Sequence, residues 1–356
     1  MTGQTVMRAA VYHGRRDVRV EDRPVPAAGE GQVLVRVARS GICGTDAGEY
    51  LHGPAMFPVA RRHPNSGHLG PMVMGHEFCG EVVATGPGAE ALAGRRVASG
   101  AGVSCGTCAW CASGRTNLCA RYWTVGLNAD GGLAHYVSVP ASTCVQVPED
   151  CGDDDAGLAQ PLAVGLHAGR RAGIRPADTV VLVGAGAIGS FILCGLAAYR
   201  PGRVIALDID DGRLATAASL GATDIVNVLG RDPVEVVADL TGGGAQVVIE
   251  ASGVDGAAQR AIHLAERGGR VLLVGLPHAP QALDVAGAAL REVDVATTLA
   301  HVCGQDIPAA LELLRDGRLA RKLVDRVIGL DALVDEGLEA LAARQAQGKI
   351  LVDPWA

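Results

Sequence analysis

Aromatic residues are scarce in this sequence: its 356 residues include three Phe, five Tyr and three Trp, or 3% of the chain. So few rings argue against a large apolar pocket lined by aromatic side chains. Basic residues are not in excess either, because 31 Lys and Arg stand against 38 Asp and Glu, for a formal charge of −7. The chain therefore lacks the basic face that binding to a phosphate backbone requires, and nucleic acid is not expected as a partner.

Long apolar runs are also few. The stretch 180–199 carries no charged residue, but Gly184, Gly186 and Gly189 interrupt it. Its pattern is typical of a buried strand, a tight turn and a helix rather than of a membrane span. The first residues show neither an apolar signal core nor an arginine-rich amphipathic stretch, so we expect a cytoplasmic protein without a membrane partner.

Glycine and cysteine are the residues that the chain does have in quantity. The 49 glycines follow no collagen-like period, and they indicate many tight turns and close backbone contacts. Apolar residues make up 49% of the chain and charged residues 19%, which is typical of a folded protein. The length is sufficient for about two to three domains.

Four of the ten cysteines lie close together, in the order Cys105-x2-Cys108-x2-Cys111-x7-Cys119. In a secreted chain this spacing would suggest disulfides, but cytosolic thiols stay reduced, and a metal is then the better interpretation. Four thiolates suit tetrahedral Zn²⁺ and leave no open coordination position. The spacing therefore predicts a structural zinc site, with chance clustering as the alternative.

Two kinds of periodicity divide the chain. Residues 7–150 contain short β segments between glycine- and proline-rich turns, and Val33, Val35 and Val37 share one face of such a segment, which is typical of a compact β barrel with long loops. Beyond Ala156, apolar strands alternate with segments of helical length, which predicts a parallel sheet with helices on both faces. The strands of that sheet are expected at 179–183, 203–208, 224–227, 246–250, 270–275 and 294–299. Helices are expected at 156–171, 308–315 and 331–346, with further strands at 323–328 and 349–352.

A glycine motif directly follows the first strand of the parallel sheet: Gly184-Ala185-Gly186-Ala187-Ile188-Gly189. In a dinucleotide-binding fold the first glycine permits a sharp turn, the second lets the backbone approach a pyrophosphate, and the third lets the helix pack against the strand. The N-terminus of the following helix supplies N–H groups and positive potential. The motif in this context predicts a dinucleotide site, with a plain glycine-rich turn as the alternative.

Asp208 ends the next expected strand, nineteen residues beyond Gly189. At that position a carboxylate accepts hydrogen bonds from the adenosine ribose, and its charge repels a 2′-phosphate. The sequence therefore favours NAD over NADP as the cofactor. Ile209 offers no cation for a phosphate, whereas Arg213 could contact the nucleotide and leaves NADP open.

Two further motifs lie ahead of the cysteine loop: Gly41-Ile-Cys43-Gly-Thr45-Asp46, and Gly75-His76-Glu77-Phe-Cys-Gly. Together with the cysteine loop and the glycine motif, and in this order, they make the chain resemble the zinc-dependent medium-chain dehydrogenase/reductases, from about Met7 to Pro354. The sorbitol, threonine and 2,3-butanediol dehydrogenase branch is the most similar, and the inserted loop from Glu49 to Gly67 is most like the butanediol type.

This resemblance implies an α/β protein in which a Rossmann domain, with a doubly wound parallel sheet, is inserted into a GroES-like β-barrel catalytic domain. The catalytic domain with its structural zinc loop is expected in 1–161 and the Rossmann domain in 162–301. The remainder, 302–356, is expected to complete the catalytic domain. The resemblance also implies a homodimer or homotetramer, with the edge strand near 294–299 as a candidate contact.

By position, the resemblance assigns Cys43, His76 and Glu77 to a catalytic Zn²⁺. Asp46 would support the His76 ring from behind, and Thr45 would pass on the proton of the substrate hydroxyl. A thiolate and a carboxylate cancel the 2+ charge of the ion, so the site is expected to be neutral and still able to bind a substrate oxygen.

The chain departs from the family at two positions. Gln160 stands where relatives often carry Cys or Glu, and it could offer an amide oxygen to the metal, hold a metal-bound water, or simply begin a helix. Gly48 stands where many relatives carry a histidine that relays the proton. His52 is a possible substitute for that histidine, with a solvated loop residue as the alternative.

The function expected from these observations is a zinc-dependent oxidoreductase that transfers a hydride between NAD and a secondary alcohol, such as a diol, polyol, sugar or cyclitol, and yields the ketone. Two Zn²⁺ per chain are expected, one catalytic and one structural. The alternatives are an aldehyde- or formaldehyde-type dehydrogenase, a non-catalytic NAD-binding protein of the same fold, and a zinc-stabilised nucleic-acid-binding module.

Overall fold

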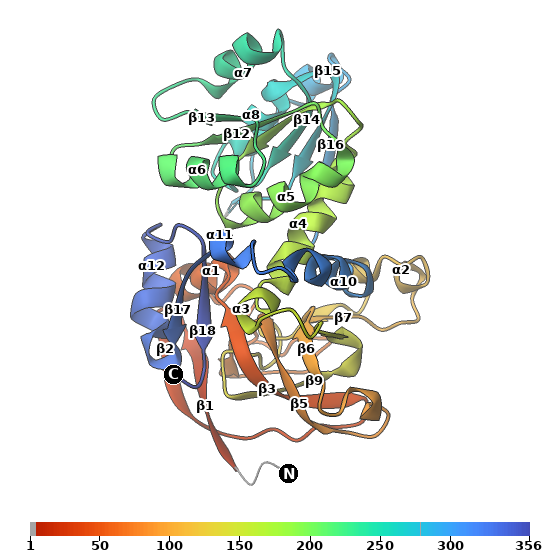
Figure 1. Cartoon of the computed structure of the whole chain (residues 1–356), viewed down its shortest axis with the longest axis vertical. Helices are drawn as coiled ribbons and strands as arrows, with labels where there is room; N and C mark the ends of the chain where they lie inside the picture. The colour runs from red at the N-terminus through yellow and green to blue at the C-terminus, as the bar shows by residue number, and fades with distance from the viewer. Residues whose placement is uncertain (1–4, 278) are drawn as a thin grey trace. The chain divides into compact units, whose positions relative to one another are not determined.

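The computed structural model describes residues 5–277 and 279–356, which form two compact units (Figure 1). The first, here called the terminal unit, contains the described part of Met1–Ala163 together with Val302–Ala356. The second, the central unit, is Val164–His301. Both ends of the chain thus contribute to the same unit, and the central unit is inserted between them in the sequence.

A six-stranded parallel sheet forms the middle of the central unit, in the order β13-β12-β11-β14-β15-β16 (Figure 1). The chain proceeds from β11 to one edge of the sheet and then returns to β14 to build the other half. This is the order of a doubly wound dinucleotide-binding sheet, in which ligands bind at the carboxyl ends of the strands where the order reverses. The strands are β11 (Thr179–Val183), β12 (Arg203–Asp208), β13 (Asp224–Asn227), β14 (Ala245–Glu250), β15 (Ala265–Leu273) and β16 (Asp294–Thr297).

Alternate residues of these strands pack on opposite faces of the sheet. Val180 and Leu182 lie in a core cluster that also contains side chains of α4, α5 and α6, whereas Val181 lies in a second cluster with side chains of α7 and α8. Because both faces are covered, the strands are apolar throughout, as the sequence pattern predicts. The helices are α4 (Ala159–Ala172), α5 (Ala187–Leu196), α6 (Asp211–Ser219), α7 (Pro233–Thr241), α8 (Ala257–Leu264), the short α9 (Val285–Ala289) and the 3-10 helix η4 (Ala197–Tyr199).

The terminal unit is built mainly from two sheets. The larger has the order β10-β6-β5-β3-β18-β17, with β9 also paired with β3, and the smaller has the order β2-β1-β4. Strand β18 brings the end of the chain beside β3, where Leu351 is paired with Gly41. The strands are β1 (Val6–Gly14), β2 (Asp17–Pro24), β3 (Gln32–Gly41), β4 (Met72–Val73), β5 (Glu77–Thr85), β6 (Arg96–Ser99), β9 (Tyr136–Pro140), β10 (Cys144–Gln146), β17 (Val324–Gly329) and β18 (Lys349–Asp353), with the separate pair β7 (Gly102–Val103) and β8 (Trp123–Thr124).

Strand β3 has both of its faces buried. Val33, Val35 and Val37 share one core cluster, as expected from their spacing, and Leu34 lies in another cluster together with Val11 of β1. The alternation of Val33, Val35 and Val37 on one face is what the interior of a closed or nearly closed barrel requires. The expected α/β architecture, a β-barrel domain with an inserted Rossmann domain, is confirmed.

The helices of the terminal unit differ from expectation in three places. The helix expected at 156–171 begins later, as α4, and the residues before it form the separate helix α3, where Arg39 and Arg96 form ion pairs with Asp154 and Asp153. The helix expected at 308–315 begins earlier, as α10. The segment expected as one helix at 331–346 combines three helix types and places Gly337 against Ile42, without room for a Cβ. The helices are α1 (Gly44–His52), α2 (Ala109–Ala112), α3 (Asp153–Ala156), α10 (Cys303–Leu314), α11 (Ala320–Leu323), α12 (Glu339–Ala342), the 3-10 helices η1 (Glu90–Leu92), η2 (Thr116–Leu118), η3 (Ala141–Thr143) and η5 (Leu330–Ala332), and the π-helix η6 (Leu333–Leu338).

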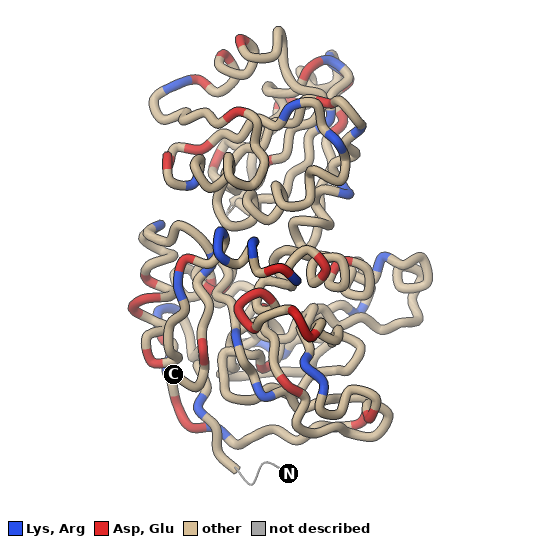
Figure 2. The backbone as a smooth tube through the Cα atoms, viewed as in Figure 1, with Lys and Arg blue, Asp and Glu red and all other residues tan. Residues whose placement is uncertain are grey.

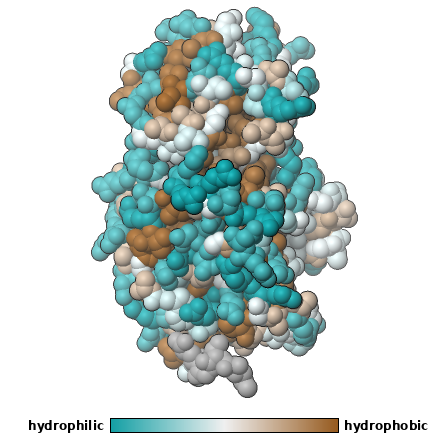
Figure 3. All heavy atoms as spheres, in the orientation of Figure 1, coloured by the Kyte–Doolittle hydropathy of each residue, from teal (hydrophilic) through white to brown (hydrophobic). Residues whose placement is uncertain are grey.

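The surface carries charges of both signs. Lysine and arginine are interspersed with aspartate and glutamate along both units (Figure 2), and polar residues lie beside apolar ones on the face seen in Figure 3. In the part of the chain that the structure describes, no helix combines the length and apolar character needed to cross a membrane.

Candidate active site and metal centres

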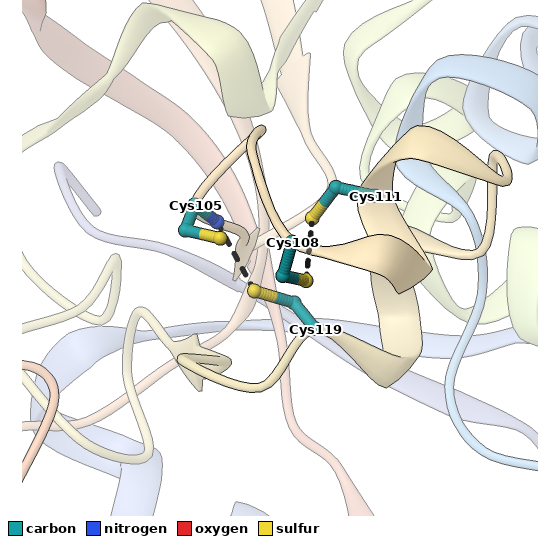
Figure 4. A group of neighbouring side chains, drawn as sticks. All are labelled: Cys105, Cys108, Cys111 and Cys119. Atoms are coloured by element: carbon teal, nitrogen blue, oxygen red, sulfur yellow. Dashed lines mark hydrogen bonds between the residues drawn. The ribbon is translucent and has the colours of Figure 1, made fainter.

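The four clustered cysteines converge in a loop that projects between β7 and β8 of the terminal unit (Figure 4). Their sulfur atoms all lie within 4.8 Å of one another. The backbone N–H groups of Cys105 and Arg121 donate to Sγ of Cys119, at 3.1 and 3.3 Å. Gly106 and Gly114, both at positive φ, allow the tight turns between the cysteines. Four sulfurs at this spacing fit a tetrahedral Zn²⁺.

The pKa values of these thiols differ, and two of them are lowered, which favours the thiolates that bind a cation. The backbone N–H of Thr107, together with its hydroxyl, lowers the pKa of Cys105 to about 5, and the backbone N–H of Ala120 lowers the pKa of Cys108. Burial raises the pKa of Cys111 to about 11 in the absence of metal. Binding of Zn²⁺ requires thiolates, so metal binding would release the remaining protons.

A second cluster forms where β3 ends and β5 begins. Cys43 follows β3, and His76 and Glu77 stand at the start of β5, which is paired with β3 so that Glu77 lies opposite Gly41. One ligand atom from each of Cys43, His76 and Glu77 lies within 4.8 Å of the others. Cys43 is half-buried and the other two are buried. Three donors of the types S, N and O in one small volume fit the three protein ligands of a catalytic zinc.

Asp46 lies behind the His76 ring, as expected. Its Oδ2 accepts a hydrogen bond of 2.8 Å from the backbone N–H of Cys43, and its Oδ1 is 3.6 Å from Nδ1 of His76. Within the described residues neither Oδ1 of Asp46 nor Nδ1 of His76 has a hydrogen-bond partner, although both are buried. Such a carboxylate orients a metal-binding histidine and leaves Nε2 for the metal.

The electrostatics of this cluster suit a cation. Burial disfavours the charged form of His76, but the negative charges of Asp46 and Cys43 outweigh it and hold the pKa of His76 well above its ordinary value when no metal is present. The anionic side chains therefore attract positive charge to this position, which a proton satisfies in the metal-free protein. The donor set and the unpartnered His76–Asp46 pair fit a zinc ion.

The other residues expected near this metal lie outside the group of three candidate ligands. Thr45 is half-buried on α1, with its Oγ1 3.7 Å from Sγ of Cys43. A Cβ added to Gly48 would meet no atom within 4 Å, so space is open at this position. His52 is exposed one turn further along α1, and Gln160 is 8% exposed on α4. The roles of Gln160 and His52 stay predictions.

Lys349 is a residue of this site that the sequence did not indicate. Its Nζ donates to both carboxylate oxygens of Glu77, at 2.7 and 2.9 Å, and to the carbonyl of Ile42 at 3.1 Å. Lysine at the start of a terminal strand is normally exposed, and its distance of 272 residues from Glu77 hides the contact in the sequence. Only the pairing of β18 with β3 brings the two together.

The glycine motif has the geometry that its residues predict. Gly184 has φ +91° directly after β11, and a Cβ on Gly189 would collide with the carbonyl of Gly184, so each of these positions requires glycine. A Cβ on Gly186 would meet nothing within 4 Å, so space is open above the backbone just before α5 begins at Ala187. Ala187 and Ile188 form the first turn of that helix. The turn can therefore accept a pyrophosphate at the helix N-terminus.

Asp208 ends β12 beside this turn. Its Oδ2 accepts a hydrogen bond of 2.7 Å from the backbone N–H of Ala185, and its Oδ1 accepts one of 2.7 Å from Ile209. These bonds fix the carboxylate at the carboxyl edge of the sheet. Arg213 is half-buried on α6, and its backbone N–H caps that helix by donating to Asp210. Its contact with a nucleotide stays a prediction.

Comparisons with known proteins agree with this geometry. Residues 29–149 match the family model described as "Alcohol dehydrogenase GroES-like domain", and residues 187–316 match "Zinc-binding dehydrogenase". The chain is 31% identical to a sorbitol dehydrogenase of Bacillus subtilis (strain 168) over 353 residues, which is 98% of this chain and 97% of the relative.

Solved structures agree as well. The crystal structure of 2R,3R-butanediol dehydrogenase from Bacillus subtilis has a TM-score of 0.89 and 32% identity, over 98% of this chain and 99% of that chain. An alcohol dehydrogenase from E. coli CFT073 in complex with NADH has a TM-score of 0.87 and 27% identity, over 98% and 100%. The chain therefore belongs to the zinc-dependent medium-chain dehydrogenase/reductase family, and it is an oxidoreductase with a GroES-like domain and an NAD-binding domain.

Proposed function

We propose that this enzyme oxidises a small secondary alcohol of the diol, polyol, sugar or cyclitol class to the ketone, with NAD as hydride acceptor. The observation that carries the proposal is the convergence of Cys43, His76 and Glu77 within 4.8 Å, in a chain that also contains a complete dinucleotide turn. The sorbitol and butanediol dehydrogenases among the relatives support this substrate class.

Cys43, His76 and Glu77 are the residues that would hold the catalytic Zn²⁺, and the four cysteines from Cys105 to Cys119 would hold the structural one. Bound zinc supplies a Lewis acid for the substrate oxygen, and bound NAD accepts the hydride. Asp46 restrains the ring of His76 by facing Nδ1, which keeps the other nitrogen directed at the metal position.

Thr45 is the residue that we assign to the substrate proton. Its hydroxyl is close to the Cys43 sulfur, and a hydroxyl can accept the alcohol proton while it donates its own. Beyond Thr45 the helix offers no side chain at Gly48, where space is open. Water in this space is therefore the route by which the proton leaves, with exposed His52 further along the same helix.

In the central unit, the six residues from Gly184 to Gly189 would bind the pyrophosphate through the N-terminus of α5. Asp208 would accept hydrogen bonds from the adenosine ribose, and its negative charge favours NAD over NADP. Arg213 is the residue at which a 2′-phosphate would find a cation. We assign 1–161 and 302–356 to catalysis and 162–301 to nucleotide binding.

We also propose a homodimer or homotetramer in the cytoplasm. Among the described residues, strand β16 lies at the edge of its sheet and pairs with β15 alone. Six large apolar side chains are exposed in 276–299, the segment that contains β16, and exposed apolar groups of this kind mark protein–protein contacts. They are Leu276, Leu283, Val285, Leu290, Val295 and Leu299. Four thiols arranged to bind a metal suit a reducing compartment.

The experiment is an activity screen with NAD and NADP against diols, polyols, cyclitols and simple aldehydes, with NADH formation as the signal. Turnover of a secondary alcohol with NAD supports the proposal. Turnover of aldehydes alone would assign the chain to the aldehyde-type alternative. Binding of NAD without turnover of any substrate by the zinc-loaded protein would favour a non-catalytic NAD-binding protein.

A further inference from the structure

Three neighbouring strands of the terminal unit place a buried ion pair, Lys349 with Glu77, in the cluster of candidate zinc ligands. Glu77 begins β5, Gly41 ends β3 and Lys349 begins β18, and these strands are adjacent in the order β5-β3-β18. The side chains of Lys349 and Glu77 are 4% and 1% exposed. The pair therefore lies in the interior, where a charge needs a partner.

The geometry leaves Lys349 no free donor. An ammonium group has three N–H donors, and here they reach Oε1 of Glu77 at 2.9 Å, Oε2 of Glu77 at 2.7 Å and the carbonyl of Ile42 at 3.1 Å. Ile42 directly precedes the metal ligand Cys43. Lys349 thus ties one ligand, Glu77, to the backbone beside another.

Glu77 in turn has little freedom to leave this position. A Cβ on Gly41 would collide with Oε2 of Glu77 and lie 3.3 Å from its Cβ, so the carboxylate fills the space that glycine leaves. A carboxylate has about four lone-pair sites, of which Lys349 occupies two. Glu77 can therefore still face a metal, but with its charge already offset by an ammonium.

We propose that Lys349 is a positioning residue that holds Glu77 as a weak, charge-compensated ligand, so that the loaded metal site does not carry an excess of negative charge. The thiolate of Cys43 and the carboxylate of Glu77 alone would cancel the charge of Zn²⁺. The carboxylate of Asp46 behind His76 adds a third negative charge. The ammonium of Lys349 offsets it, so the loaded site is neutral rather than anionic and can still attract a substrate oxygen. The proposal rests on the proposed function only in assigning Cys43, His76 and Glu77 to zinc.

The test compares Lys349→Met, which removes the charge, with Lys349→Arg, which keeps it. The readout is the dissociation constant of the catalytic Zn²⁺ from competition with a chelator, with Cys43→Ala protein as the blank that reports the structural site alone. Removing a positive charge a few ångströms from a divalent ion strengthens its binding, by about tenfold or more at an effective dielectric constant near 20. We expect this gain in Lys349→Met and wild-type affinity in Lys349→Arg.

A zinc affinity in Lys349→Met that is unchanged or weaker would overturn the proposal. That result is expected if Lys349 only anchors β18, because its removal would then not strengthen zinc binding. Substitution with Co²⁺ adds a second readout, since the visible spectrum of the bound ion should change in Lys349→Met and not in Lys349→Arg. A spectrum that is the same in both variants would also count against the proposal.

Loss of Lys349 could unfold the protein by leaving Glu77 buried without a partner. The same comparison is then made in Glu77→Gln protein, in which loss of Lys349 leaves no buried carboxylate without a partner. Adding Lys349→Met to Glu77→Gln should tighten zinc binding by about tenfold or more, since an unopposed ammonium is removed from the metal site. No gain in that pair would refute the charge effect.

These outcomes are separate from those of the activity screen. Zinc affinities that follow the proposal in a protein without dehydrogenase turnover would reject the function and retain the role of Lys349. Dehydrogenase turnover in the wild type, with unaltered zinc affinity in Lys349→Met, would retain the function and reject the role of Lys349. Wild-type protein that binds no second zinc would reject both.

Discussion

Replacement of Gly41 by alanine is the most specific structural perturbation that the site offers. The new methyl group would collide with Oε2 of Glu77, while the backbone of Gly41 needs no unusual φ angle. Glu77 is 1% exposed and cannot move its carboxylate into solvent without leaving Lys349. Overpacking costs about 1–3 kcal/mol, and breaking a buried ion pair costs about 3–5 kcal/mol. Partial relaxation places the expected loss near 3 kcal/mol.

The assay is thermal unfolding followed by tryptophan fluorescence. All three tryptophans, Trp110, Trp123 and Trp355, lie in the terminal unit, so the signal reports on the unit that contains Gly41. For a unit of this size a loss of about 3 kcal/mol lowers Tm by about 6–12 °C. The matched control is Gly48→Ala in the interior of α1, where a Cβ meets nothing within 4 Å, and it should stabilise the helix by about 0.5–1 kcal/mol. Wild-type Tm and zinc content in Gly41→Ala would refute the account of a filled space around Glu77.

Three further substitutions test the other parts of the site. Asp208→Asn keeps an acceptor for the N–H of Ala185 but removes the negative charge. The ratio of the KM for NADP to the KM for NAD should therefore fall by about tenfold. An unchanged ratio would place Asp208 away from the ribose. Cys111→Ser should lower the zinc content from about two to about one per chain and reduce Tm, whereas full zinc content by elemental analysis would contradict a four-thiolate site. Gln160→Glu should slow alcohol oxidation several-fold, because a further negative charge makes the metal a weaker Lewis acid. An unchanged steady-state rate would show that Gln160 does not face the metal.

The architecture followed from the sequence because the signals were local. The buried parallel strands are continuous apolar runs between turn residues, and β11, β12 and β13 have the bounds that the pattern predicts. The glycine motif is also local, since Gly184 has a positive φ within the turn itself and Gly189 packs against the carbonyl of Gly184. The helical segment at 331–346 is less regular than predicted, because its turns adapt to packing against Ile42 rather than to propensity.

The candidate site was predictable only in part. Cys43, His76 and Glu77 carry ligand chemistry in their side chains, so motifs reveal them. Lys349 acts through a contact across 272 residues, and Gly41 acts by the absence of a side chain, which no motif distinguishes from an ordinary strand end. The position of the Glu77 carboxylate depends on both residues, so it could not be predicted from the motifs alone.

The central claim is that Cys43, His76 and Glu77 hold a zinc ion on which alcohol oxidation depends. The most direct measurement is the zinc content and the NAD-dependent turnover of Cys43→Ala beside the wild-type enzyme, with the best secondary alcohol of the screen. We predict about two zinc ions and turnover in the wild type, and about one zinc ion and no turnover in the variant. Wild-type turnover in a variant that has lost one equivalent of zinc would contradict the account.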